Sequence, residues 1–122
     1  MKTIIAGSRE AGAELIDVVM AVLKCGWRVT EVVSGTAPGV DKLGEEYAKL
    51  LNLPIHRFPA DWAKYGKRAG RVRNAQMADN AEALIAVWDG KSSGTENMID
   101  MAKTRSLKVY IHYLNQKTGG KL

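Results

Sequence analysis

The fold is decided by one stretch, residues 83–95, which reads ALIAVWDGKSSGT. Its first part, Ala83–Trp88, is an unbroken apolar run with the length of a strand that is buried on both faces. Its second part, Asp89–Thr95, is a loop that contains two glycines and opens a helical pattern reaching about Thr104. A buried strand followed by a short loop and a helix is the repeating unit of a parallel α/β sheet.

The same unit recurs along the rest of the chain. Runs rich in β-formers predict further strands at residues 2–6, 29–33, 54–59 and 107–112, and apolar residues at helical spacing predict helices at 15–25, 40–51 and around Arg73. Prolines at both ends of the third strand favour an edge position. We therefore predict an α/β fold, a Rossmann-like three-layer sandwich whose five-stranded parallel sheet has the order 3-2-1-4-5 and carries helices on both faces. Residues 60–67 are predicted to form an irregular loop.

Length and composition indicate one domain without a membrane segment. The chain has 122 residues, of which 46% are hydrophobic and 25% are charged, and its net charge is +5. We expect a single domain at residues 1–113 and a flexible C-terminal tail at 114–122. No apolar run is long enough for a bilayer or a signal peptide, and the single cysteine, Cys25, cannot form an internal disulfide, so a cytoplasmic setting is expected. His56 and His112 lack metal-ligand spacing, so we predict no metal site and no cofactor.

Three loops of small residues follow the first, second and fourth predicted strands, at 7–9, 34–39 and 90–95. In a parallel sheet these loops meet at the carboxyl edge, where ligands bind. Glycine lets the backbone approach a ligand, and the helix after each loop offers unpaired N–H groups and a partial positive charge. Hydroxyl and guanidinium groups add further donors for phosphate. The chain therefore predicts a site for a phosphorylated small molecule at Gly7, Ser8, Arg9, Ser34, Gly35, Thr36, Gly39, Asp41, Arg73, Gly94 and Thr95.

Three of these residues also fit a purely structural role. Arg73 shares a helical face with Ala69 and Met77, so its guanidinium either points inward toward an anion or buries its stem and reaches water. Thr95 fits a plain helix N-cap. Asp41 lies just inside the second helix, where a carboxylate either holds the loop or contacts a ribose.

A basic and aromatic stretch covers the predicted 60–67 loop and the helix after it. Trp62 is a candidate ligand-binding residue, because it and Tyr65 can stack on a base, although Trp62 can equally cover the edge of the sheet. The nearby cations form either a solvated helix face or a surface that attracts a ligand or nucleic acid: Lys64, Lys67, Arg68, Arg71 and Arg73.

Several motifs occur in an order that resembles a known superfamily. They lie between residues 2 and 112 and include Gly7-Ser8-Arg9, Ser34-Gly35 with Gly39-Val40-Asp41, Phe58-Pro59-Ala60-Asp61-Trp62, Gly66-Lys67 with Ala69-Gly70, Arg73-Asn74 with Met77, and Gly94-Thr95. This set resembles the YspA-like, cpYpsA-related branch of the SLOG superfamily, which also contains DNA-processing protein A and the Lonely Guy phosphoribohydrolases. The resemblance implies a Rossmann-like fold and a nucleotide or nucleotide-derivative ligand, adds Asn74 to the ligand site, and suggests a sensor or processor of the kind found in phage and bacterial conflict systems.

The likeness to the phosphoribohydrolases is partial. Those enzymes carry an Arg-Lys-x-x-Met motif and then Pro-Gly-Gly-x-Gly-Thr-x-x-Glu. Arg73 and Met77 match the first motif with Asn74 in place of lysine, and Gly94-Thr95 match the second motif without its Pro-Gly-Gly.

A hydrolase of this kind would need a substitute carboxylate. Met98 occupies the position of the catalytic glutamate. Cleavage of an N-glycosidic bond needs charge stabilisation and usually a carboxylate that places water. Arg73 would then anchor the phosphate or sugar, and Glu96 or Asp61 would act as the acid and base.

Three functions follow from these residues. The first is binding of a nucleotide or nucleotide derivative at the three-loop edge, as a sensor or processor. The alternative is N-glycosidic hydrolysis of a nucleotide, and the second alternative is binding of single-stranded nucleic acid. No membrane partner is expected. The sequence does not fix the oligomeric state: relatives in the resembled superfamily commonly dimerise through helices that flank the site, and the broad apolar faces of the helices at Leu15–Leu23 and Met98–Ala102 permit a homodimer.

Overall fold

A five-stranded parallel sheet forms the centre of the structure, a computed structural model that describes residues 1–9 and 12–114. The predicted strand order is confirmed, because the strands lie in the order β3-β2-β1-β4-β5 and all neighbours are parallel. From β1 the chain first builds the sheet outward through β2 and β3 and then continues on the other side of β1 with β4 and β5. The switch therefore lies between β1 and β4, where Gly7 at the end of β1 pairs with Val87. The strands are β1 (Lys2–Gly7), β2 (Glu31–Ser34), β3 (Ile55–Arg57), β4 (Ala83–Trp88) and β5 (Lys108–Tyr113).

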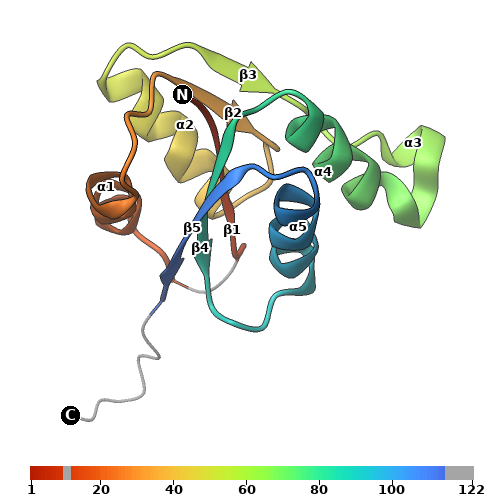
Figure 1. The fold of residues 1–122 in the computed structure, drawn as a ribbon. Helices are drawn as coiled ribbons and strands as arrows, with labels where there is room; N and C mark the ends of the chain where they lie inside the picture. The colour runs from red at the N-terminus through yellow and green to blue at the C-terminus, as the bar shows by residue number, and fades with distance from the viewer. Residues whose placement is uncertain (10–11, 115–122) are drawn as a thin grey trace, which may run out of the picture.

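Helices cover both faces of the sheet, as predicted (Figure 1). One face carries α1 (Leu15–Lys24) and α2 (Val40–Leu50), and the other carries α4 (Ala69–Asp79) and α5 (Ser93–Thr104). Successive strand residues point to opposite faces. Ile4 therefore packs in the core beneath α4 and α5, while Ile5 packs in the core beneath α1 and α2. Both side chains are fully buried.

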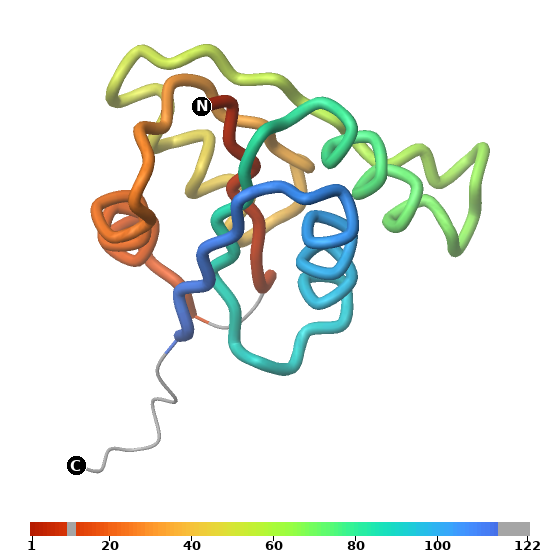
Figure 2. The backbone as a smooth tube through the Cα atoms, viewed as in Figure 1, coloured from red at the N-terminus to blue at the C-terminus, as the bar shows by residue number. Residues whose placement is uncertain are grey.

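The predicted irregular loop at 60–67 is wrong, because most of it is helical. A short helix, α3 (Trp62–Tyr65), leads through the 3-10 turn η1 (Gly66–Arg68) directly into α4. Asp61 caps α3, since its Oδ1 accepts a hydrogen bond from the backbone N–H of Lys64 at 3.0 Å. Gly66 has a φ of +56°, which bends the chain between the two elements. The segment α3–η1, called the overhang below, projects from the body beyond α4 (Figure 2).

The apolar faces of α1 and α5 differ from the prediction. Met98 and Ala102 of α5 are buried in the core of the domain itself. Ile16 and Leu23 of α1 are 56% and 74% exposed. Dimerisation stays a prediction, and of the two helices considered for it α1 exposes apolar side chains. None of the helices in the described ranges combines the length and apolar character needed to cross a bilayer.

The sheet hydrogen bonds extend one residue beyond the predicted end of the domain at residue 113. The backbone N–H of Leu114 donates to the carbonyl oxygen of Trp88 at 2.8 Å, so Leu114 still belongs to the edge of the sheet and not to a tail. The rest of the predicted tail, residues 115–122, lies outside the described residues.

Candidate functional site

A cleft of about 780 Å³ opens at the carboxyl edge of the sheet, where β1 and β4 end side by side. Its walls come from the β1–α1, β2–α2 and β4–α5 loops, the first turns of α2 and α5, and the facing side of the overhang and α4. This volume is in the range of small-molecule sites. The described charged side chains on its walls are four cations and two carboxylates, and this excess of positive charge favours an anion: Arg9, Lys67, Arg71, Arg73, Asp41 and Asp89.

Arg73 points inward from α4, as one of its two predicted orientations requires. The residue is only 9% exposed, and Ala69 and Met77 on the same helical face are also buried. Its Nη1 donates to the carbonyl oxygen of Gly35, and its Nε donates to Oδ1 of Asn74 at 3.1 Å. Burial lowers the pKa of the guanidinium, while the nearby Asp41 opposes that shift. Its head group therefore lies at the cleft wall and not on the open surface of the helix, and its role toward an anion stays a prediction.

The third guanidinium nitrogen of Arg73 is open to the cleft. Nη2 takes part in none of the hydrogen bonds between described residues. No buried side-chain nitrogen or oxygen in the described part of the chain lacks a hydrogen-bond partner. Nη2 therefore has accessible surface, and Arg73 lines the cleft. A fixed, largely desolvated cation thus presents one free edge to whatever occupies the cleft.

Asn74 connects Arg73 to the first turns of α5. Its Oδ1 accepts from Arg73, and its Nδ2 donates to the carbonyl oxygen of Gly94 at 3.3 Å and to Oδ1 of Asn97 at 3.0 Å. Asn74 and Asn97 both line the cleft. The amide of Asn74 therefore fixes the guanidinium relative to the N-terminus of α5. Asn97 was not predicted, because its position on the cleft depends on how α4 and α5 pack together.

Asp41 faces Arg73 across Gly35. A Cβ atom added to Gly35 would lie 2.7 Å from Nη1 of Arg73 and 2.8 Å from Oδ2 of Asp41. The absence of a side chain at position 35 is therefore what lets the two charged groups approach each other. Asp41 is 5% exposed, and its Oδ2 accepts from the backbone N–H of Ala37 at 3.1 Å. It thus holds the loop, as one of the two predicted roles requires.

The carboxyl group of Asp41 has an unusual proton affinity. Burial raises its pKa from 3.8 to about 6. The N–H of Ala37 and the charges of Arg73 and Arg9 act in the opposite direction, and Glu45 adds to the rise. Groups whose pKa is raised by burial inside a cleft are enriched at functional sites.

This shift predicts how stability depends on pH. The folded chain binds the proton of Asp41 more tightly than the unfolded chain does, so this carboxyl stabilises the fold below about pH 4 and loses that contribution as the pH rises through about 6. We expect Asp41→Asn to raise the free energy of unfolding at pH 7 by about 1–2 kcal/mol and to leave it nearly unchanged at pH 4. Urea unfolding of both proteins at pH 4, 5, 6 and 7 measures the difference. A difference that is the same at all four values would contradict the prediction.

Most of the second predicted loop lies beneath the cleft, and Ala37 is its one residue that lines the walls. Ser34 is fully buried; its hydroxyl donates to Oε2 of Glu45 at 2.6 Å and accepts from the backbone N–H of Thr36 at 3.0 Å. Although burial raises the pKa of Glu45, hydrogen bonds from Ser34 and Arg57 hold it below its ordinary value. Ser34 and Thr36, predicted as ligand contacts, therefore anchor the loop to α2.

Three glycines of the predicted loops serve the packing of the backbone. Gly35 makes room for Arg73 as described, and it does not line the cleft. Gly39 has a φ of +83°, and a Cβ there would lie 2.6 Å from the carbonyl oxygen of Ser8. Gly7 lines the cleft, yet a Cβ there would lie 2.0 Å from the carbonyl oxygen of Val87. These contacts explain the glycines without a ligand.

Ser8 and Asp89 join the first and third loops. The hydroxyl of Ser8 accepts from the backbone N–H of Asp89 at 3.1 Å and lies 3.2 Å from Oγ of Ser92. Oδ1 of Asp89 accepts from the backbone N–H groups of Lys91 and Ser92, both at 2.8 Å, and these bonds hold the pKa of Asp89 below its ordinary value. Asp89 is therefore a carboxylate on the cleft wall that the sequence reading missed. An aspartate directly after a strand and before a glycine is the local signal for such a turn.

Helix α5 begins two residues earlier than predicted, at Ser93. Ser92 is the N-cap residue, so Gly94 and Thr95 lie within the first turn, and the N-cap role considered for Thr95 is wrong. Thr95 is 6% exposed. Ser93, Gly94 and Thr95, the residues of the first turn, all line the cleft. The first backbone N–H groups of a helix have no hydrogen-bond partner within that helix. The cleft therefore receives the positive end of α5.

The structure places neither predicted acid/base residue in the cleft. Glu96 is exposed on α5 and is absent from the cleft walls. Asp61 caps α3 and lines a smaller adjacent pocket of about 250 Å³. Met98 does line the cleft. The described carboxylates that reach the cleft are Asp41 and Asp89.

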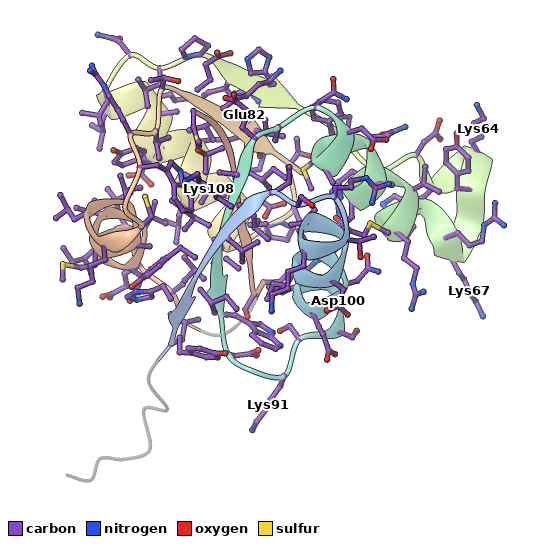
Figure 3. All side chains as sticks on the ribbon, in the orientation of Figure 1. Lys64, Lys67, Glu82, Lys91, Asp100 and Lys108 are labelled. Carbon is purple, nitrogen blue, oxygen red and sulfur yellow. The ribbon has the colours of Figure 1, made fainter. Side chains whose placement is uncertain are left out.

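Trp62 lies at the rim of the cleft on the overhang. It is 55% exposed, it lines the cleft, and its ring lies near Gly70 of α4. Of the exposed cations nearby, Lys64 and Lys67 project from the overhang into solvent (Figure 3). Lys67 and Arg71 nevertheless line the cleft. The stretch thus combines a solvated basic face with two cations at the site.

The two histidines pair with carboxylates outside the cleft. His56 Nε2 lies 2.7 Å from Glu31, and His112 Nε2 lies 3.1 Å from Asp17. Within residues 1–9 and 12–114, no group of three histidine, cysteine or acidic side chains is arranged to hold a metal ion.

Comparison with known proteins gives a relative from a phage. No protein-family model matches the chain. The Gene 61 protein of Mycobacterium phage D29 is 31% identical to it over 84 residues, which cover 64% of this chain and 67% of the phage protein. The chain belongs to the family of this phage protein. The relative's name states no activity or ligand, so the function of the family has to be argued from the cleft.

Proposed function

We propose that the chain binds a nucleotide or a nucleotide derivative in the cleft, as the resemblance to the SLOG superfamily implies. The observation that carries the proposal is Arg73, a buried guanidinium with one nitrogen open to the cleft. A charge-assisted hydrogen bond from a guanidinium to phosphate is stronger than a neutral one, and its strength increases where water is excluded. The cation is held by Gly35 and Asn74, so binding requires little reordering of its side chain.

Two further features support a phosphorylated ligand with an aromatic base. The first turn of α5 lines the cleft, its first N–H groups have no partner within the helix, and helix N-termini bind phosphate. Trp62 offers a half-exposed indole at the rim, where a base can stack. In such a complex the phosphate would bind at Arg73 and the first turn of α5, and the base would lie toward Trp62 on the overhang.

The test is a panel of ribonucleotides, NAD and ADP-ribose read in two ways. Thermal shift reports binding, and chromatography of the same mixtures reports products. We expect at least one nucleotide to raise the melting temperature in a concentration-dependent manner, since a ligand that binds only the folded chain stabilises it. Inorganic phosphate, tested alone, controls for a general anion effect. No shift with any member would contradict the proposal.

The panel also tests for N-glycosidic hydrolysis, and a labelled oligonucleotide tests for single-stranded nucleic-acid binding. Free base in the chromatogram would identify N-glycosidic hydrolysis and would direct attention to Asp41 and Asp89 as the carboxylates at hand. Single-stranded nucleic-acid binding is favoured by the exposed cations Lys64 and Arg68 on the overhang. A labelled oligonucleotide that binds at low salt, and much more weakly after about a fourfold rise in salt, would support that alternative.

A further inference from the structure

Asp41 has one carboxylate oxygen that the fold does not use. Its Oδ2 accepts from the backbone N–H of Ala37. Its Oδ1 takes part in none of the hydrogen bonds between described residues. In that part of the chain, every side-chain oxygen that is fully buried has a hydrogen-bond partner. Oδ1 therefore has accessible surface, and Asp41 lines the cleft. Holding the loop accounts for one oxygen and leaves the other free for a ligand.

The accessible Oδ1 of Asp41 can accept a hydrogen bond from a ligand. Asp41 and Arg73 are neighbours above Gly35, yet the ion pairs between described side chains do not include them. An ionised carboxylate only accepts hydrogen bonds, and it repels phosphate. The anionic part of a ligand is therefore expected at Arg73 and the N-terminus of α5, while the part that faces Asp41 carries an N–H or O–H group.

In a nucleotide, the donors nearest the phosphate are the sugar hydroxyls. Resting on the proposed function, we propose that Asp41 recognises one hydroxyl of the ligand's sugar, 2′ or 3′, so that the cleft selects ribonucleotides over the deoxy analogue that lacks this hydroxyl. Asp41 is a suitable residue for this, because the first turn of α2 and the 34–39 loop hold it in place. A site built to accept a hydrogen bond from a hydroxyl rejects analogues that lack it, since a buried polar atom is then left without a partner.

The test compares AMP, GMP, CMP and UMP with their 2′-deoxy and 3′-deoxy forms by calorimetry. For the nucleotide that binds best, we expect one of the two deoxy forms to bind at least about tenfold more weakly. Ribose 5-phosphate against its 2-deoxy or 3-deoxy form, whichever matches the sensitive position, repeats the comparison without a base, which separates a hydroxyl from a base N–H as the donor.

The variant Asp41→Asn keeps the size of the side chain and removes the charge. We expect it to reduce the ribo-to-deoxy ratio to about threefold or less. A merely structural role would weaken both forms equally and leave the ratio unchanged. Asp100→Asn is the matched control, because Asp100 is exposed on α5 and absent from the cleft walls.

The outcomes distinguish this inference from the proposed function. Equal binding of the ribo and both deoxy forms by the unaltered protein overturns the role of Asp41 and leaves nucleotide binding standing. A ratio that Asp41→Asn does not change also overturns it. If no nucleotide binds and NAD and ADP-ribose also fail to bind, both proposals are contradicted.

Discussion

Replacing Gly7 with alanine is expected to lower the free energy of unfolding by about 3–5 kcal/mol. The added Cβ would lie 2.0 Å from the carbonyl oxygen of Val87 and 2.9 Å from Cγ2 of Val40. The first contact is with backbone, and that same carbonyl accepts the N–H of Ser8 at 3.1 Å. Relief of the clash therefore requires β1 and β4 to separate at the point where the cleft begins. Urea unfolding followed by circular dichroism measures the loss.

Gly94→Ala is the matched control for this prediction. Both glycines belong to loops that looked equally suited to a ligand, yet a Cβ on Gly94 would have no atom within 4 Å. Because Gly94 lies in the first turn of α5, alanine there should leave stability unchanged or raise it by about 0.5–1 kcal/mol. A Gly7→Ala protein as stable as the Gly94→Ala protein would show that the β1–β4 contact is not what requires glycine.

The contrast between these two glycines shows what the sequence could and could not predict. The strand order was predictable because the strands and the longer helices have local sequence signals, an apolar run such as Ala83–Trp88 or helical spacing, and because parallel crossovers allow few strand orders. A glycine carries no such signal. Whether it serves a ligand, a turn or a close backbone contact depends on residues far away in the chain, as Val87 is from Gly7.

The residues of the candidate site likewise differ in whether the local sequence could indicate their roles. Arg73 could be singled out because a permanent cation between Ala69 and Met77 on a helical face is uncommon, but its orientation could not be predicted, since an inward and an outward guanidinium give the same pattern. The roles of Asp89 and Ser8 could not, because they depend on a hydrogen bond between two loops that are 81 residues apart. The helix at Trp62–Tyr65 was missed for a local reason, since four residues are too few to show helical periodicity.

Arg73→Ala is expected to weaken nucleotide binding by about 3 kcal/mol, roughly a hundredfold in Kd. The change removes the fixed cation, and it also leaves the carbonyl oxygen of Gly35 without its donor. Loss of this positive charge should raise the pKa of Asp41 further, because Arg73 now lowers it. The phosphate would then face only helix N–H groups and the more distant cations of the cleft. Isothermal titration calorimetry with the best-binding member of the panel measures the change.

Arg73→Lys tests whether the shape of the guanidinium matters beyond its charge. A lysine retains the positive charge, but its single ammonium cannot reproduce the fork that now reaches Gly35, Asn74 and the cleft at once. We expect an intermediate loss of about 1–2 kcal/mol in binding. Arg105→Ala is the control, because Arg105 pairs with Asp79 at 2.7 Å on the exposed surface and does not line the cleft. If Arg73→Ala bound nucleotide as tightly as Arg105→Ala, the buried cation could not be the phosphate anchor, and the ligand would have to be sought at the exposed cations of the overhang.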